Sequence, residues 1–176
     1  MAKRIGKVSS ILSLTHLKLT SIQELAELTS KPPPLMKINL PNESDLHKWH
    51  IILSGPPSSP FEGGSFTLLL TLPKDYPFKP PLLSFQTKIY HPNVSNDDKG
   101  AMCLGILKPD EWKPAIKIVD VLEFMAQVIR EPNLDDAVEQ SIAHEMREDR
   151  KAWEKKAKEW TRKYASGKDG TSENAT

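Results

Sequence analysis

The sequence predicts an α+β fold, because a short helical pattern is followed by four strand-like runs and then by further helical patterns. The strand-like runs cover residues 36–40, 49–53, 66–72 and 82–85. The segments between them contain turn residues and are too short for crossover helices, so we expect a four-stranded antiparallel meander. The length of 176 residues suits one domain with a full hydrophobic core.

Helical periodicity lies on both sides of the predicted sheet. Residues 21–28 place apolar side chains on one face, and Ser21 with Glu24 matches a capping box. Residues 118–129 are apolar on most sides, which is typical of a buried helix, and Pro132 ends this pattern. We therefore expect one helix before the strands in the sequence and a second, buried helix after them.

The C-terminal part predicts two more helices. An apolar stripe runs through residues 142–164 and ends at Trp160 and Tyr164, and Asp149 is placed to cap a break between two helices. Residues 166–176 are small and polar and are expected to form a flexible tail.

Composition excludes several functional classes. The chain has 24 basic and 23 acidic residues, so its charge gives no general attraction for nucleic acid. No apolar run approaches the roughly 20 residues of a membrane span. One cysteine, Cys103, cannot form an intrachain disulfide and excludes a multi-cysteine zinc site. We expect no nucleic-acid partner, no membrane span, no metal and no cofactor, in a reducing compartment, the cytoplasm or the nucleus.

The functional hypothesis rests on an irregular segment, residues 90–114, which contains Cys103 and Asn93. A long segment without regular structure inside a domain is usually functional. A cysteine thiol can form a thioester, and attack on a thioester passes through an oxyanion that one amide donor stabilises by about 3–4 kcal/mol. We expect Asn93 to be that donor. Asp97, Asp98 and Lys99 nearly offset one another in charge, so we expect an ordinary thiol at Cys103.

Seven separated motifs resemble the ubiquitin-conjugating enzymes, in the family's order. They are SPFEGG (59–64), DYPFKPP (75–81), YHPN (90–93), CL (103–104), IL (106–107), WKPA (112–115) and EPN with DD (131–136). The similarity covers about residues 23–165 and is closest to the short, single-domain members of fungal or similar eukaryotic type. The resemblance implies the ubiquitin-conjugating fold over this core.

The resemblance also implies a mechanism. Cys103 would accept the C-terminal glycine of ubiquitin as a thioester and pass it to a substrate lysine with the help of a ligase. Asp136 would orient the lysine and take its proton, Asn133 would order this gate, and His91 would support the loop of Asn93. The enzyme itself would need no cofactor, since the activating enzyme consumes the ATP.

Partner surfaces follow from the same resemblance. Phe78, Pro114 and Ala115 would contact a ligase of the RING or HECT type, and Lys3 and Arg4 would contact the activating enzyme. The expected partners are ubiquitin, the activating enzyme, a ligase and protein substrates, and the protein is expected to be a monomer.

A terminal segment, a loop and a single residue depart from the family's pattern. Residues 1–22 form an atypical basic segment, because Lys3 and Arg4 lie seventeen residues before the helical pattern that they normally open. We expect residues 6–22 to be an insertion, such as a translated intron. The loop from Asn93 to Cys103 is about two residues longer than is common, yet should leave the two residues adjacent. Gly105 stands where close relatives often have Asp, which argues against efficient transfer to lysine without a ligase.

Three other interpretations remain open at this point. In the first, the protein has the same fold and uses Cys103, but it conjugates another ubiquitin-like modifier. In the second, it is a non-catalytic interaction module of the same fold. It would instead be an unrelated cysteine hydrolase if His91 lay within hydrogen-bond reach of the Cys103 sulfur.

Overall fold

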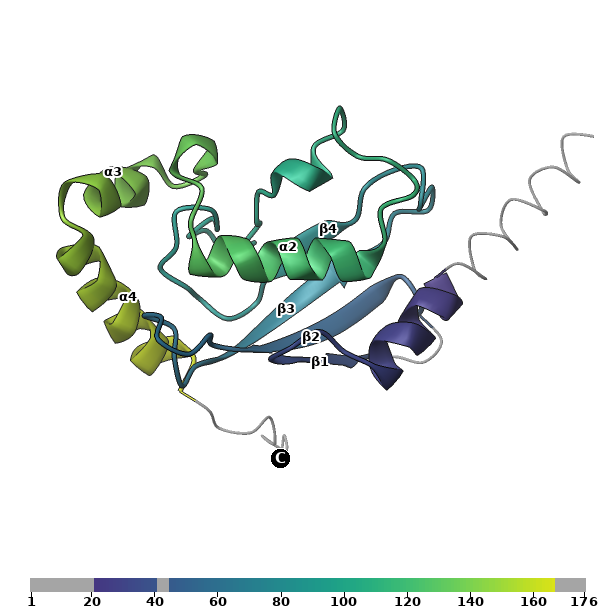
Figure 1. Ribbon diagram of the computed structural model, residues 1–176, viewed down its shortest axis with the longest axis horizontal. Helices are drawn as coiled ribbons and strands as arrows, with labels where there is room; N and C mark the ends of the chain where they lie inside the picture. Colours follow the sequence, from purple (N-terminus) through teal and green to yellow (C-terminus); the bar gives the residue numbers. More distant parts are fainter. Residues whose placement is uncertain (1–20, 41–44, 167–176) are drawn as a thin grey trace, which may run out of the picture.

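Four antiparallel strands form one sheet in the order β1-β2-β3-β4 (Figure 1). The computed structural model describes residues 21–40 and 45–166. The strands are β1 (Met36–Asn39), β2 (Lys48–Ser54), β3 (Ser65–Thr71) and β4 (Leu82–Phe85). Every second residue along β2 and β3 is buried, as expected for strands with one face on the core. The predicted meander is confirmed, with strand ends within a few residues of those expected.

Helices surround this sheet. A helix over residues 21–30 precedes β1, and three helices follow the sheet: α2 (Ile118–Arg130), α3 (Gln140–Glu148) and α4 (Arg150–Tyr164). In Figure 1, α2 crosses the sheet, the N-terminal helix lies near the start of α2, and α3 and α4 lie at the opposite end. The α+β class is therefore confirmed. Two short 3-10 turns, η1 (Gly105–Leu107) and η2 (Leu134–Asp136), lie in the connections.

The core lies between α2 and the sheet. The inward face of α2 is fully or nearly fully buried and consists of Ile118, Val121, Leu122, Met125, Val128 and Ile129. Phe61 joins this core to α4, because its ring makes edge contacts with Phe66 at 6.1 Å and with Trp153 at 6.3 Å between centroids. Burial of these large side chains fixes the helices against the sheet.

The break between α3 and α4 occurs at Asp149, as the sequence predicts. Asp149 Oδ1 accepts a hydrogen bond from the backbone N–H of Ala152 at 3.0 Å, which is an N-cap of α4. The predicted apolar stripe is wrong at its end, since Tyr164 is 38% exposed. Thr161 is buried in its place because its hydroxyl bonds the carbonyls of Pro60 and Ala157.

Glu24 fastens the N-terminal helix to the rest of the domain. Its carboxylate, predicted to complete a capping box, accepts hydrogen bonds from two groups outside its own helix. These are the Tyr76 hydroxyl at 2.5 Å and the backbone N–H of Ile118 at 2.9 Å, at the start of α2. Burial, followed by the adjacent Glu24 carboxylate, raises the pKa of Tyr76. One buried carboxylate therefore joins the helix to both a loop and α2.

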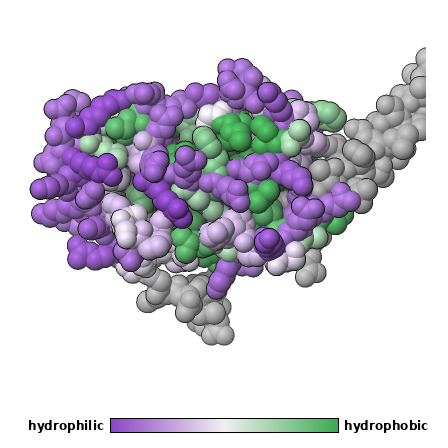
Figure 2. All heavy atoms as spheres, viewed as in Figure 1, coloured by the Kyte–Doolittle hydropathy of each residue, from purple (hydrophilic) through white to green (hydrophobic). Residues whose placement is uncertain are grey.

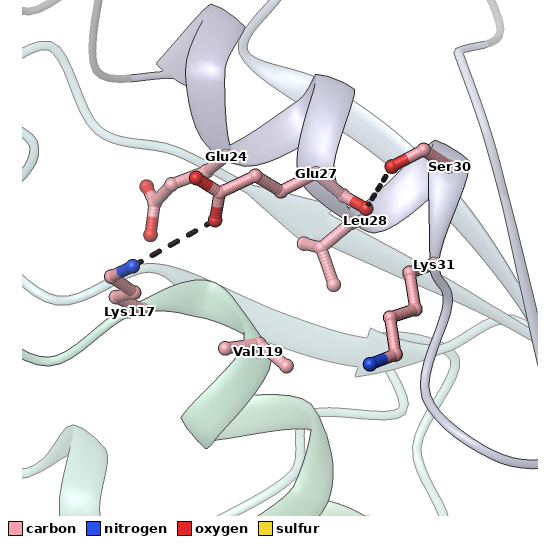
Figure 3. Close-up of a pocket in the computed structure, with 7 residues that line it drawn as sticks. All are labelled: Glu24, Glu27, Leu28, Ser30, Lys31, Lys117 and Val119. Atoms are coloured by element: carbon pink, nitrogen blue, oxygen red, sulfur yellow. Dashed lines mark hydrogen bonds and ion pairs between the residues drawn. The ribbon is translucent and has the colours of Figure 1, made fainter.

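A hollow lies beside this junction, between the N-terminal helix and the first turn of α2 (Figure 3). Lys117 and Glu27 form an ion pair across it with 3.7 Å between Nζ and Oε2. Both side chains are exposed, so this pair contributes little stability. The buried contacts of Glu24 therefore hold the helix more firmly than the ion pair does.

Several predictions fall on parts of the chain that the structure does not describe. Lys3, Arg4, most of the expected insertion (residues 6–20) and most of the tail (residues 167–176) lie outside the described residues. Ser21 and Ile22, the last residues of the expected insertion, belong to the N-terminal helix. Across residues 21–40 and 45–166, no helix has the length and apolar character to cross a membrane.

Candidate active site

Cys103 lies in the middle of the irregular segment, and its backbone is next to that of Asn93. Its backbone N–H donates to the carbonyl of Asn93 at 3.1 Å, and Val94 and Met102 form an antiparallel bridge beside this contact. The neighbours Met102 and Leu104 are buried, whereas Cys103 is partly exposed. The predicted adjacency of Asn93 and Cys103 is confirmed by the hydrogen bond between their backbones, and Cys103 is the partly exposed member of this strand-like bridge.

The longer loop between these residues closes through Asp97 and Gly100. Asp97 Oδ1 accepts the backbone N–H groups of Lys99 and Gly100, both at 3.0 Å. Gly100 has a φ of 57°, and a Cβ there would lie 2.0 Å from the Phe85 carbonyl oxygen. Glycine is therefore required at this position.

His91 is fully buried and is bound on both ring nitrogens. Nδ1 accepts the backbone N–H of Asn93 at 3.0 Å, so Nε2 carries the hydrogen and donates to the Val128 carbonyl at 3.1 Å. Burial lowers the pKa of His91 to about 3, which keeps the ring neutral. Both nitrogens bond backbone groups, which argues against the hydrolase interpretation, since a hydrolase would need His91 as a base for Cys103.

Asn93 uses its whole carboxamide to hold a loop. Nδ2 donates to the carbonyls of Asn133 at 2.8 Å and Asp136 at 3.1 Å, and Oδ1 accepts the backbone N–H of Asn133 at 3.0 Å. Both amide hydrogens thus have acceptors other than a thioester. The oxyanion role stays a prediction, and it requires one of these hydrogen bonds to open during the reaction.

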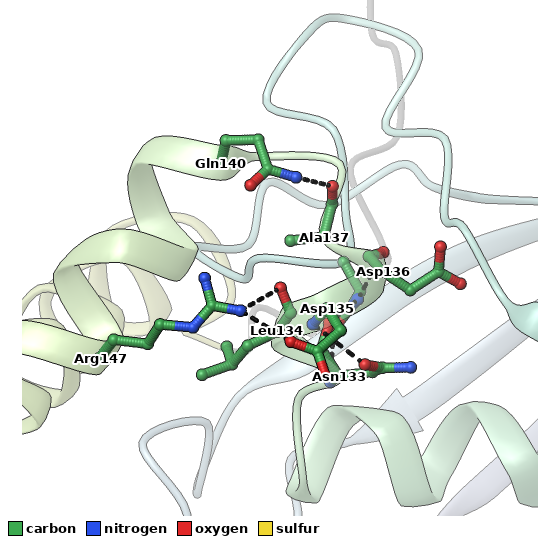
Figure 4. A network of polar contacts seen from close by, with 8 residues as sticks. Asn133, Leu134, Asp135, Asp136, Ala137, Gln140 and Arg147 are labelled. Atoms are coloured by element: carbon green, nitrogen blue, oxygen red, sulfur yellow. Dashed lines mark hydrogen bonds and ion pairs between the residues drawn. The ribbon is translucent and has the colours of Figure 1, made fainter.

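The loop that Asn93 holds is residues 133–139, which we call the gate segment. Figure 4 shows its polar contacts: Arg147 of α3 donates to the Leu134 carbonyl at 3.0 Å and to Asp135 Oδ1 at 2.9 Å. Asn133 Oδ1 accepts the backbone N–H of Asp135 at 3.2 Å. Arg147 is a supporting residue that sequence reasoning missed, because nothing in its helix links it to a loop twelve residues earlier.

Asp136 and Lys108 form an ion pair beside the cysteine. Lys108 Nζ lies 2.8 Å from Asp136 Oδ1, and their side chains are 43% and 29% exposed. The hydrogen bond to Asp136 raises the pKa of Lys108. Sequence reasoning also missed Lys108, although its position five residues after Cys103 was a signal that could have been followed.

The electrostatic surroundings of Cys103 differ from the expected ones. Burial raises the pKa of the Cys103 thiol, the Asp136 carboxylate raises it further, and Lys108 opposes this shift. The charges that act on the thiol are therefore Asp136 and Lys108. The prediction of an ordinary thiol is wrong, because burial and a carboxylate from a distant part of the sequence raise its pKa. A raised pKa means that the resting thiol is mostly protonated at neutral pH.

Two exposed loops carry the residues expected to meet a ligase. Phe78 is 68% exposed, and Pro114 and Ala115 are also exposed. The indole Nε1 of Trp112 donates to the Pro77 carbonyl at 2.7 Å, which fastens one loop to the other.

Two features bear on other expected functions. No group of three or more His, Cys, Asp or Glu side chains within the described ranges is placed to hold a metal ion. Figure 2 shows a hydrophilic surface over α3 and α4. On α4, Glu154 and Glu159 lie among the basic residues, and Glu154 forms an ion pair with Arg150 at 3.2 Å. Charges of both signs are typical of a solvated helix face.

Comparison with known proteins agrees with the fold and with the class of protein that the sequence motifs indicate. The family model described as ubiquitin-conjugating enzyme matches residues 20–161. The chain is 43% identical over 143 residues to "Ubiquitin conjugating enzyme E2 B" of Dictyostelium discoideum. The aligned region covers 81% of this chain and 94% of that protein.

The chain therefore belongs to the ubiquitin-conjugating enzyme family. It is a transferase of protein ubiquitination, as the sequence motifs predicted. Membership implies three kinds of partner, namely ubiquitin, a ubiquitin-activating enzyme and a ubiquitin ligase.

Proposed function

We propose that Cys103 receives ubiquitin as a thioester and passes it to a substrate lysine. The observation that supports this most directly is the position of the chain's one cysteine, partly exposed beside Asn93 and within the electrostatic reach of Asp136. A thiol in that place can be reached both by the activating enzyme and by an incoming amine.

The two steps exchange one bond for another. In charging, the Cys103 sulfur attacks the thioester on the activating enzyme, and that enzyme's sulfur leaves. In discharge, a neutral lysine amine attacks the carbonyl carbon, the C–N bond forms, and the Cys103 sulfur leaves as thiolate. A free lysine has a pKa about 3.4 units above pH 7, so only about 1 in 2,500 molecules is neutral.

Asp136 serves discharge by positioning the amine and accepting its proton. A carboxylate by itself favours the ammonium form, so exclusion of water at the thioester must supply the opposing shift. Asn133 orders the gate segment, His91 supports the loop of Asn93 without titrating near neutral pH, and Asn93 donates to the oxyanion when its amide is released.

The partner surfaces are assigned within the same proposal. Phe78, Pro114 and Ala115 contact the ligase, of the RING or HECT type, and their exposure supports this assignment. Lys3 and Arg4 contact the activating enzyme. The protein acts as a monomer on protein substrates. It acts in the cytoplasm, the nucleus or both, and its single unpaired cysteine agrees with such a reducing compartment.

A charging assay tests the proposal. Ubiquitin, its activating enzyme and ATP should give an adduct on the wild-type chain that a thiol reductant removes. Cys103→Ser should give an ester that survives the reductant, because oxygen is a poorer leaving group than sulfur. No adduct on either chain would favour a non-catalytic module, and an adduct only with another modifier would assign that modifier instead.

A second assay tests the ligase surface. Phe78→Ala should charge normally but lose stimulation of lysine discharge by a RING ligase. Tyr164→Ala is the matched control, because it removes an exposed aromatic side chain from α4, outside the assigned surface. Equal stimulation of both variants would remove Phe78 from the ligase surface.

A further inference from the structure

Lys108 occupies the place at Asp136 that a substrate lysine needs. Its ammonium donates to Asp136 Oδ1 at 2.8 Å. Asn93 holds Asp136 in position, because its side-chain amide donates a hydrogen bond to the Asp136 carbonyl. Lys108 itself follows directly after η1, the turn that begins two residues beyond Cys103. A primary amine of the chain is thus already bound by the carboxylate that is proposed to bind the acceptor.

The same amine is electrostatically coupled to the reacting sulfur. The charge of Lys108 lowers the pKa of Cys103, and the Cys103 thiolate raises the pKa of Lys108. Across the described parts of the chain, Lys108 forms the one ion pair of Asp136. Lys108, Asp136 and Cys103 therefore form one charge cluster, in which an acceptor lysine must replace Lys108.

We propose that Lys108 is a built-in competitor of the acceptor lysine for the Asp136 carboxylate. This inference rests on the proposed role of Asp136 and adds a specificity-determining residue to it. An acceptor lysine that brings further contacts, from its own protein or from a ligase, displaces Lys108 readily. A free lysine brings none, so Lys108 restricts discharge to amines that a partner presents.

The size of the effect follows from the exposure of the pair. Both side chains are partly exposed, and such ion pairs are worth about 0.2–1 kcal/mol, which is about 1.4- to 5-fold in a binding constant. Removal of Lys108 should therefore lower the half-saturating concentration of free lysine by about 1.4- to 5-fold. The limiting rate should not rise, because Lys108 acts on the binding of the acceptor and its charge lowers the pKa of the leaving Cys103 thiolate.

The test is single-turnover discharge of the ubiquitin thioester at increasing concentrations of free lysine, without a ligase. Lys108→Gln removes the competing charge, whereas Lys108→Arg retains it and should resemble the wild type. Lys88→Gln is the matched control, because it removes a lysine from another ion pair, that with Asp98. Charging of Cys103 with ubiquitin is measured first in every variant. A wild-type chain that does not charge would contradict the proposed function, whereas the competition is judged only from the discharge of variants that charge.

Two further measurements separate competition from other effects. Hydroxylamine is a neutral nucleophile at pH 7 and needs no carboxylate, so Lys108→Gln should not accelerate its reaction with the thioester. In an Asp136→Asn background, Lys108→Gln should no longer alter the lysine dependence, since the shared carboxylate is gone.

Three results would overturn the inference in a chain that charges normally. The first is an unchanged half-saturating lysine concentration in Lys108→Gln. The second is equal acceleration with lysine and with hydroxylamine, which would indicate a more reactive thioester. The third is a ubiquitin remnant on Lys108 after discharge, found by peptide mapping, which would make Lys108 an acceptor rather than a competitor.

Discussion

Asn93 and Asn133 are joined by two hydrogen bonds that run in opposite directions. The Asn93 amide donates to the Asn133 carbonyl at 2.8 Å, and the Asn133 backbone N–H donates to Asn93 Oδ1 at 3.0 Å. A third hydrogen bond reaches the Asp136 carbonyl at 3.1 Å. One buried side chain therefore determines where the gate segment, and with it the Asp136 carboxylate, lies relative to Cys103.

Asn93→Ala should destabilise the protein as well as slow catalysis. Loss of three buried hydrogen bonds, worth about 0.5–1.5 kcal/mol each, should lower the free energy of unfolding by about 2–4 kcal/mol. Urea denaturation measures this, with Asn96→Ala as an exposed asparagine control in the same loop that should change stability by less than about 0.5 kcal/mol. A purely catalytic Asn93 would leave the urea midpoint unchanged.

His91 should make the protein less stable in mild acid. The pKa of His91 is about 3 in the folded state and about 6.5 in the unfolded state. Between these values the unfolded chain binds more protons than the folded one, so the free energy of unfolding decreases as the pH is lowered. From about pH 7.5 to about pH 5 the loss attributable to His91 should be about 2 kcal/mol. Urea denaturation at both pH values should show this loss disappear in His91→Gln but persist in His144→Gln, whose side chain is exposed.

The reactivity of Cys103 should respond to Asp136 and Lys108 in opposite directions. Asp136 raises the pKa of the thiol and Lys108 lowers it, so Asp136→Asn should speed alkylation by iodoacetamide and Lys108→Gln should slow it. Each change should be at most about fivefold, because the groups are partly exposed. Asp98→Asn is the control for closeness in sequence alone, and an effect of Asp98 equal to that of Asp136 would contradict the assigned surroundings.

Gly105→Asp should accelerate discharge to free lysine without a ligase. No atom lies within 4 Å of a Cβ built on Gly105, so the substitution should be accepted without strain. A second carboxylate, two residues from Cys103, would attract the acceptor ammonium, with an expected gain of about two- to fivefold. The measurement is single-turnover discharge beside Gly105→Asn, which adds the same bulk without the charge and should resemble the wild type.

Glu24→Ala should detach the N-terminal helix. Two hydrogen bonds to a buried carboxylate, worth about 1.5–3 kcal/mol each, would be lost, so we expect a fall of about 3–5 kcal/mol in the free energy of unfolding. Glu27→Ala, three residues away, removes only the exposed pair with Lys117 and should cost less than about 1 kcal/mol. Similar losses in the two variants, measured by urea denaturation, would contradict the role given to Glu24.

The sequence predicted those parts of the structure that depend on local pattern. Alternation and turn residues located the meander, helical periodicity located α2, and a capping residue located the start of α4 at Asp149. The end of the last stripe failed, because Thr161 became buried through hydrogen bonds that a hydropathy pattern does not register.

The site was predicted as a set of residues but not as a set of contacts. Motifs placed Asn93, Cys103 and Asp136 in one region, yet gave no sign that the Asn93 amide is occupied by the gate segment. The Lys108–Asp136 and Glu24–Tyr76 contacts join residues 28 and 52 positions apart. Such pairs depend on how separate elements pack, which spacing in the sequence does not determine.

The hydrogen bond from Trp112 to the Pro77 carbonyl has a consequence for how a ligase is recognised. Because this bond fastens the Phe78 loop to the Pro114–Ala115 loop, the two halves of the proposed ligase surface are held together before any partner arrives. Association then loses little loop entropy, and more of the contact energy remains as affinity. Loss of the indole N–H should therefore weaken ligase binding even though Trp112 itself is buried.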